Sequence, residues 1–250
     1  MSVSILKASL ALAGLGFCCQ NLSAAAQTVG SVFGPGVNAD DRQWEYRIGI
    51  APDEGDNGDA AINQRLHYQH ALNDSVRLRG IVQGANSNDG DWEFRFVQGE
   101  LVWQVIEKTP RGHQGGFRFD FRLNEGDDGA NQFGLNWTSQ LDLDNGWRLR
   151  GLILLDADVG DRARDGVFIE TRMAASRKLE NGLRISLDSF NIYGNSDAGF
   201  GNFNDQQHQL GPSVSGPIGT DGWGWFAGAL FGVSDGADET NFQFRLTKNL

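Results

Sequence analysis

From residue 42 to the end of the chain, apolar and polar side chains alternate with a period of two. The clearest stretch is 117–123, in which Phe and Leu at odd positions are separated by Arg118, Asp120 and Arg122. Stretches 132–141 and 242–246 repeat the pattern. A period of two places successive side chains on opposite faces of a β-strand, whereas an amphipathic helix needs a period near 3.6, which no stretch after residue 42 shows. The pattern therefore predicts an all-β fold.

Clusters of Asn, Asp and Gly separate the alternating stretches and predict hairpin turns. A strand of about ten residues can cross a bilayer when it is tilted. We expect a bulge near Gln98-Gly99, where the apolar phase shifts, and a weak tenth strand, because Gly211-Pro212 and Gly216-Pro217 interrupt it. The twelve predicted strands are 42–51, 61–72, 75–85, 91–106, 115–124, 130–142, 147–156, 166–178, 182–193, 205–215, 222–233 and 239–250.

The first 26 residues have the pattern of a secretory signal peptide. Lys7 precedes an apolar run at 8–17, and small residues follow at 24–26. The apolar run is too short for a membrane-spanning helix. Cleavage after Ala26 would also remove Cys18 and Cys19, the two cysteines of the chain. We therefore divide the chain into a signal peptide (1–26), an N-terminal periplasmic segment (27–41) and a β-domain (42–250).

Charge and composition exclude several classes of protein. The chain has 21 Lys and Arg against 32 Asp and Glu, a formal charge of −11, so we expect no nucleic acid partner. A hydrophobic content of 40% with a mean hydropathy of −0.38 excludes a membrane protein of many helices. Longer acidic loops follow the odd-numbered strands, and several shorter turns follow the even-numbered ones. This asymmetry is typical of bacterial outer-membrane barrels, in which the long loops face outside.

Alternation alone does not say which face of the sheet meets water. A soluble secreted β-protein would turn its apolar face inward, and a membrane barrel would turn it toward lipid. The polar face is rich in arginine and nearly free of lysine, unlike an ordinary solvated surface. Aromatic residues lie near predicted strand ends, where interfacial girdles form: Trp44, Trp92, Trp147, Tyr193 and Trp223. We favour the membrane barrel and keep the soluble protein as the alternative.

The signal peptide, the hairpin-linked strands and the alternating last strand, with Phe242, Phe244 and Leu246, resemble a bacterial outer-membrane β-barrel. In size and arginine content the chain is similar to small twelve-stranded porins for acidic oligosaccharides. The chain ends in Leu250, where the usual terminal residue of such barrels is Phe. The resemblance implies an antiparallel up-and-down transmembrane barrel in the outer membrane of a Gram-negative bacterium. Its expected partners are outer-membrane lipid, lipopolysaccharide and the barrel-assembly machinery.

A lumen lined by arginine favours anions, because guanidinium groups stay charged and bind oxyanions in pairs of hydrogen bonds. We therefore expect passive diffusion of small anionic solutes. Interleaved acidic residues could instead pair with the arginines and close the lumen, which would make the barrel a plugged structural protein. The expected lumen residues are Arg47, Arg65, Arg77, Arg79, Arg95, Arg118, Arg122, Arg148, Arg150, Arg172, Arg184, Arg245, Glu45, Asp120 and Glu170.

A lipid-modifying enzyme is the remaining class, and the sequence favours it less. His67 and His70 lie three residues apart on a predicted strand and so point to opposite faces. Ser75 and Ser189 have no evident base partner, and neither a Gly-x-Ser-x-Gly nor a His-Glu-x-x-His motif occurs. We expect no catalytic residues, no metal site and no cofactor. The oxygen-rich stretches 53–59 and 86–91 lack EF-hand spacing, and we interpret them as solvated loop tips.

Overall fold

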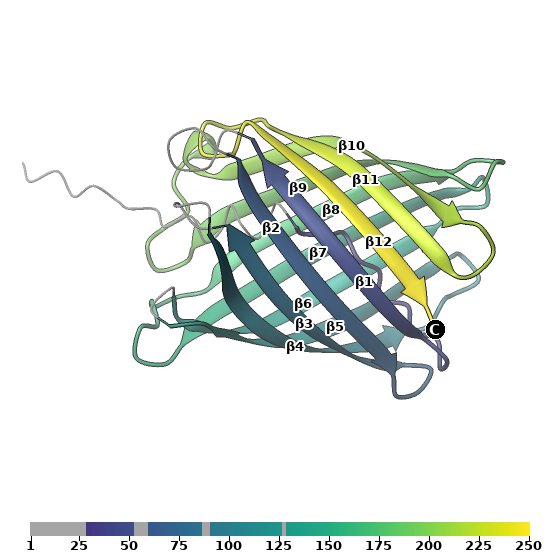
Figure 1. Ribbon diagram of the computed structural model, residues 1–250, viewed down its shortest axis with the longest axis horizontal. Coiled ribbons are helices and arrows are strands. Elements are labelled where there is room, and N and C mark those ends of the chain that lie inside the picture. Colours follow the sequence, from purple (N-terminus) through teal and green to yellow (C-terminus); the bar gives the residue numbers. More distant parts are fainter. Residues whose placement is uncertain (1–28, 53–59, 87–90, 127–128) are drawn as a thin grey trace, which may run out of the picture.

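The computed structural model describes residues 29–52, 60–86, 91–126 and 129–250, which form a closed antiparallel barrel (Figure 1). Each strand pairs with its neighbours in the chain, and β12 pairs with β1 to close the wall. The expected fold is therefore confirmed. The strands are β1 (Arg42–Ala51), β2 (Ala61–Ala71), β3 (Val76–Asn86), β4 (Trp92–Ile106), β5 (His113–Asn124), β6 (Asn131–Asp142), β7 (Trp147–Val159), β8 (Phe168–Lys178), β9 (Arg184–Asn195), β10 (Gln207–Ile218), β11 (Trp223–Gly232) and β12 (Thr240–Asn249).

The expected signal peptide and the acidic stretch 53–59 lie outside the described residues. Within the described part, each predicted strand corresponds to one observed strand, with ends that differ by a few residues. The tenth strand is longer than predicted and runs through both Gly-Pro pairs. Gly211 makes this possible, because a Cβ built there would lie 1.8 Å from the carbonyl oxygen of Ala229 on β11. The glycine allows a close approach that no other residue would allow.

The bulge in β4 does not lie at Gln98-Gly99. The register between β3 and β4 shifts where Gln83 pairs with Phe96 and the next residue, Gly84, pairs with Phe94, so Arg95 is the extra residue. The prediction was wrong because Phe94 and Phe96 have the spacing of two residues on the same face of a regular strand. Phe94 is exposed, whereas Phe96 is buried inside the barrel between two guanidinium groups.

The two faces of the wall differ in the way that a membrane barrel requires. On β4, Leu101 and Trp103 point outward and are 37% and 46% exposed, while their neighbours Glu100, Val102 and Gln104 point inward and are buried. The same contrast recurs around the wall, for example at Phe133 and Leu135 on β6. Water would penalise such a continuous apolar exterior, whereas lipid accommodates it. The soluble alternative therefore does not fit this structure.

The two rims of the barrel are also different. One rim, here the turn rim, holds Arg42, Leu250 and the turns 72–75, 107–112, 143–146, 179–183 and 219–222 (Figure 1). The other, the loop rim, holds the connections after odd-numbered strands. Trp44, Trp147 and Trp223 are exposed near the turn rim, and Trp92 is exposed near the loop rim. No helix among the described residues is long and apolar enough to span a membrane.

Candidate functional site in the barrel lumen

The alternation of each strand turns the predicted lumen residues toward the barrel axis. Arg95 differs from the others, because it is the bulge residue near the loop rim. Glu100 and a set of inward glutamines were not predicted, although their positions in the period-two alternation indicate the inward face. The remaining predicted residues lie on the inward face: Arg47, Arg65, Arg77, Arg79, Arg118, Arg122, Arg148, Arg150, Arg172, Arg184, Arg245, Glu45, Asp120 and Glu170.

A buried ion-pair network joins β3, β4 and β5 across the middle of the wall. Glu100 lies 3.2 Å from the guanidinium nitrogens of both Arg79 and Arg118. Arg118 is also 3.2 Å from a carboxylate oxygen of Asp120, and Asn136 donates to Asp120 at 2.6 Å. Each charge in this network has an opposite charge beside it, which offsets the cost of removing both from water.

Further ion pairs lie between alternate residues of one strand or between facing residues of neighbouring strands. Arg47 bonds Glu45 on β1 at 2.5 Å, and Arg172 bonds Glu170 on β8 at 2.6 Å. Arg148 on β7 bonds Asp142 on β6, also at 2.5 Å. These pairs are the interleaved acid–base contacts that the plugged-barrel alternative expects. They do not account for all of the cations.

Two groups of basic side chains have no carboxylate within 4.0 Å among the described residues. The first, the Phe96 cluster, consists of Arg65, Phe96 and Arg122. The guanidinium carbons of Arg65 and Arg122 lie 5.3 and 4.4 Å from the centre of the Phe96 ring, within the range of cation–π attraction. Both arginines otherwise bond glutamines, Arg65 with Gln83 and Arg122 with Gln98 and Gln132.

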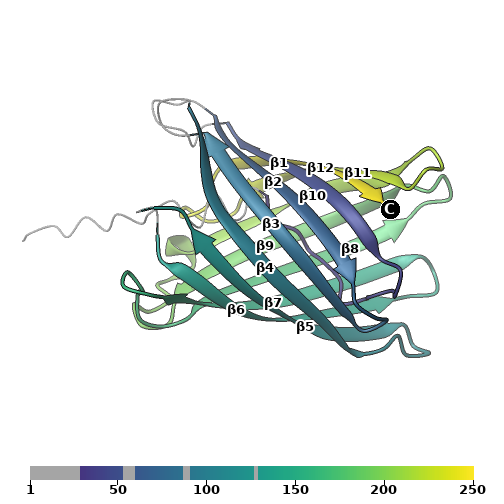
Figure 2. The same cartoon turned by 60° about the horizontal axis from the view of Figure 1, so that its bottom comes forward.

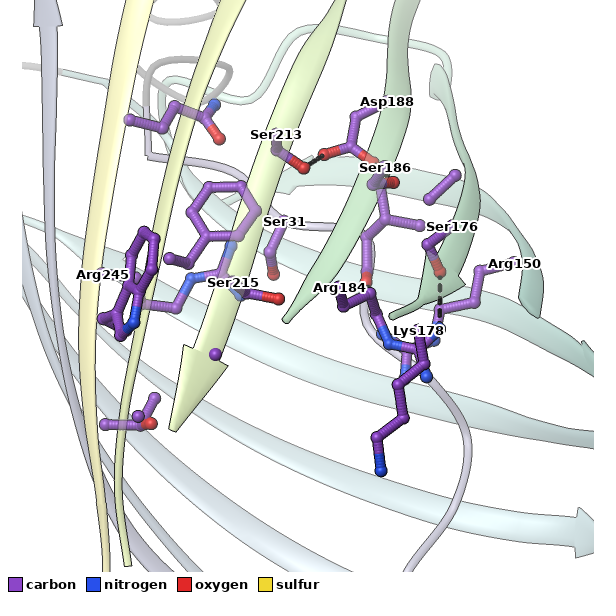
Figure 3. A pocket seen from close by; sticks show the side chains of 18 of the residues that line it. Ser31, Arg150, Ser176, Lys178, Arg184, Ser186, Asp188, Ser213, Ser215 and Arg245 are labelled. Atoms are coloured by element: carbon purple, nitrogen blue, oxygen red, sulfur yellow. Dashed lines mark hydrogen bonds between the residues drawn. The ribbon is translucent and has the colours of Figure 1, made fainter. Parts of the chain in front are cut away.

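The second group, the cavity cluster, consists of Arg150, Lys178 and Arg184. It borders a cavity of about 420 Å³ in the half of the lumen near the turn rim (Figure 3). Arg184 bonds the hydroxyl of Ser176 at 3.1 Å. Arg150 bonds the side-chain oxygen of Gln140 at 2.6 Å. The walls come from β7 to β12 and from Ser31 and Val32.

The cavity lining contains one carboxylate, that of Asp188, and two serine hydroxyls donate hydrogen bonds to this carboxylate. Ser186 donates to Asp188 at 2.5 Å and Ser213 donates at 2.6 Å, and Figure 3 shows both serines beside the carboxylate. Arg245, on the opposite wall, stacks on the ring of Phe226 at 4.3 Å and lies 3.7 Å from Glu45. The cavity therefore presents guanidinium, ammonium and hydroxyl donors with little negative charge to oppose them.

Residues 29–37 belong to the segment 27–41, which the sequence predicts to lie in the periplasm, outside the barrel. Residues 29–37, here the lumen segment, lie inside the barrel, where Figures 1 and 2 show them in purple behind the wall. Lumen side chains donate hydrogen bonds to its backbone carbonyls: Arg47 to Val29 (3.1 Å), Arg172 to Ser31 (3.2 Å), Arg150 to Val32 (3.2 Å), Thr138 to Phe33 (3.0 Å) and Arg77 to Gly36 (3.4 Å).

Apolar contacts hold the same segment. Phe33 packs against Leu152 and Leu154, two leucines of β7 that point inward, and the guanidinium of Arg118 lies 4.7 Å from its ring centre. At the turn-rim end, Val37 packs with Ala71 and Val102, and its amide donates to Gln104 at 2.9 Å. The lumen thus has apolar positions where the segment needs them, among walls that are otherwise polar.

One histidine and one serine are in hydrogen-bond contact on the outer face, because Nε2 of His113 on β5 lies 3.1 Å from the hydroxyl of Ser139 on β6. His67 points inward and His70 outward, as strand geometry predicts. His208 bonds the side-chain oxygen of Asn191 at 2.9 Å, and the amide nitrogen of Asn191 in turn donates to the hydroxyl of Ser189 at 3.1 Å. The described residues contain no group of three His, Cys, Asp or Glu side chains that could hold a metal ion.

The apolar exterior and the closed twelve-stranded wall around a polar lumen define a β-barrel of the membrane type. No protein-family model matches the sequence, and no curated protein matches it. Solved structures resemble it in fold. The KdgM porin in complex with disordered oligogalacturonate superposes with a TM-score of 0.58 at 8% identity, over 83% of this chain and 99% of that one.

Two other outer-membrane proteins superpose equally well. For the NanC porin the TM-score is 0.58 at 8% identity, over 82% of this chain and 97% of that one. For an outer membrane channel from Pseudomonas putida F1 the TM-score is 0.60 at 9% identity, over 84% and 96%. The expected architectural resemblance to small twelve-stranded porins is therefore confirmed. At this identity the likeness is one of fold.

Proposed function

We propose that the protein is an outer-membrane channel for passive diffusion of small anionic solutes through its arginine-lined lumen. The observation that carries the proposal is the cavity cluster, in which Arg150, Lys178 and Arg184 face a cavity of about 420 Å³ without a carboxylate partner. Basic groups that were only structural would be neutralised, as Arg118 is by Glu100. Groups left with free charge beside a cavity attract anions.

The two carboxylate-free clusters lie at different heights in the lumen. Arg65, Phe96 and Arg122 lie in the half toward the loop rim, and the cavity cluster lies in the half toward the turn rim. Permeation requires sites that bind an ion weakly enough to release it to the next. A solute would lose part of its hydration shell at the first cluster. At the second cluster, basic groups and serine hydroxyls of β8, β9 and β10 would donate hydrogen bonds to it in place of the lost water.

The apolar outer face and the two rims suggest how the barrel is placed in the outer membrane. The apolar outer face would contact outer-membrane lipid, and the loop rim would face lipopolysaccharide. The turn rim, with both ends of the barrel, would face the periplasm after export by the signal peptide and insertion by the barrel-assembly machinery. The KdgM structure contains oligogalacturonate, a chain of carboxylates, which supports an anionic solute for a barrel of this fold.

Uptake into vesicles tests this function. Liposomes that contain the barrel should take up glucuronate faster than glucosamine, a cationic sugar of similar size, with glucose between them. Lys178→Glu with Arg184→Glu should reverse the order. Arg177→Glu is the matched control, because Arg177 lies next to Lys178 on the outward face, so it should change nothing. An unchanged order in the double variant would contradict the anion pathway.

The lumen segment and the ion-pair network favour a second candidate, a plugged barrel without transport. In that case no sugar of any charge should enter the vesicles faster than it enters protein-free liposomes. Size and charge would have no influence. The same uptake series therefore separates the two candidates.

A further inference from the structure

We propose that residues 29–37 form a gate that anionic solutes displace from the lumen. This inference rests on the proposed channel function. The lumen segment lies beside the cavity, because Ser31 and Val32 form part of its wall. It belongs to no strand of the barrel, and side chains hold it by the hydrogen bonds described above. It can therefore leave without breaking the β-sheet.

The lumen wall is shaped to hold this segment. A Cβ built on Gly34 would lie 2.6 Å from the side-chain oxygen of Gln140, and one on Gly36 would lie 2.9 Å from that of Gln114. Across from Pro35, Gly116 leaves the space that a side chain would fill. Leu152 and Leu154 supply the apolar contact for Phe33. A wall that fits a segment this closely indicates a defined docked state.

The docked segment is uncharged, so an anion can compete with it for the arginines of the lumen. The segment has the sequence Val-Gly-Ser-Val-Phe-Gly-Pro-Gly-Val and no charged side chain. It therefore offers neutral carbonyl oxygens to arginines. A hydrogen bond from guanidinium to a carbonyl has one charged partner, whereas a bond to an anion has two and gains the Coulomb attraction between opposite charges. An anion in the lumen is consequently a better partner for these arginines than the segment is.

Arg150 connects the cavity to the gate. Its Nη1 atom donates to the carbonyl of Val32 at 3.2 Å, and its side chain also lines the cavity. Arg47 and Arg172 have Glu45 and Glu170 as partners, whereas Arg150 has no carboxylate within 4.0 Å in the described part of the chain. An anion that binds in the cavity would draw Arg150 from Val32 and loosen the middle of the segment.

A reversible disulfide tests whether the segment is a gate. Gly36→Cys with Gln114→Cys would tether the segment to β5, because the end of the Gln114 side chain reaches the Cβ position of Gly36, with its Oε1 2.9 Å away. A short bis-thiosulfonate linker, which forms a disulfide with each cysteine, spans the length that the shorter cysteine side chain leaves open. Cys18 and Cys19 lie in the expected signal peptide and would not interfere. In planar bilayers the linked variant should pass little current, and reduction should raise the current several-fold. Gly36→Cys alone is the control and should not respond to reduction.

A variant that lacks residues 29–37 sets the reference for an open lumen, after heat-modifiable migration has shown that each variant is folded. The deletion should conduct more than the reduced tethered protein. Equal current in the linked, reduced and deleted forms would overturn the gate and leave the channel function standing. No current even in the deletion would overturn the proposed function itself, and the gate with it.

The labelling of Gly36→Cys by a membrane-impermeant maleimide tests the trigger. Potassium glucuronate should raise the labelling rate several-fold, since it competes for the arginines, and glucose at the same concentration should not. Equal rates in both sugars would overturn displacement by anions. Arg150→Gln should reduce the effect of glucuronate, because the connection between cavity and gate is then broken.

Discussion

At the scale of single residues, the lumen contains charges of two kinds. Arg118, Arg79 and Glu100 are buried and paired, and their arrangement stabilises the wall. Arg150, Lys178 and Arg184 have no carboxylate within 4.0 Å among the described residues and border the cavity. Burial with a partner indicates a structural role, whereas an unneutralised charge beside open space is available to a solute. Substitution of a paired charge should therefore change the stability of the barrel, and substitution of a charge beside the cavity should change which solutes pass.

Glu100→Gln should destabilise the barrel. The substitution leaves Arg79 and Arg118 without the charge that both contact at 3.2 Å, and breaking a buried pair in this way costs about 3 kcal/mol or more. The unfolding free energy in guanidinium chloride, measured on barrels in lipid vesicles, checks this. Arg184→Gln, whose side chain bonds one serine, is the comparison and should have a much smaller effect. Equal losses would mean that the network is not structural.

Phe119→Arg tests the orientation of the wall. Phe119 lies in the middle of β5 on the outward face, opposite Leu135 of β6. A charged side chain at the bilayer midplane costs about 2–4 kcal/mol. The same unfolding assay should show this loss, and Leu72→Arg in the exposed turn after β2 should show almost none. A negligible effect at Phe119 would contradict the lipid contact.

At the scale of elements, β10 shows how one glycine keeps a strand in the sheet. A Cβ at Gly211 would collide with the backbone of Ala229, so β11 could not pack against β10 at that point. Gly80 on β3 differs, because a Cβ there meets no atom within 4 Å. The packing of β10 against β11 therefore requires glycine at position 211, whereas the space around position 80 would also accept a side chain.

Gly211→Ala should therefore destabilise the barrel by about 1–3 kcal/mol, the usual cost of overpacking, while Gly80→Ala should stay within about 0.5 kcal/mol. Heat-modifiable migration and the midpoint of thermal unfolding in detergent report both changes. A Gly211→Ala barrel as stable as the Gly80→Ala barrel would show that β10 and β11 can separate there without loss.

The strands could be predicted because local signals specify them. The period-two alternation and the Asn, Asp and Gly clusters identified all twelve strands, and the face that each arginine occupies followed from its position. The bulge at Arg95 was misplaced because Phe94 and Phe96, two positions apart, suggest one face of a regular strand, whereas the bulge puts them on opposite faces. Phe96 is apolar yet points inward, since Arg65 and Arg122 stack on it. Nothing in its own strand indicates this.

The lumen segment could not be predicted, because the stretch 29–37 has no period and no charge. Its place depends on partners far along the chain, such as Thr138, Arg150 and Arg172. One signal was present in the sequence. Leu152 and Leu154 interrupt the polar inward row of β7, and an apolar inward position in a polar lumen implies an apolar partner.

At the scale of the whole molecule, the barrel separates an apolar exterior from a cationic lumen, although the chain as a whole has a charge of −11. The acidic residues gather in the loops that follow odd-numbered strands and in the ion pairs of the lumen. Because the unneutralised cations lie inside, we propose that charge selectivity depends on the lumen and not on the net charge of the chain.

The reversal potential in a planar lipid bilayer under a KCl gradient shows whether the cationic lumen makes the barrel anion-selective. It should be measured on the wild-type barrel and on the variant that lacks residues 29–37, so that a closed gate does not hide the result. We expect chloride to permeate better than potassium in both proteins. A preference for potassium in the opened barrel would contradict the account.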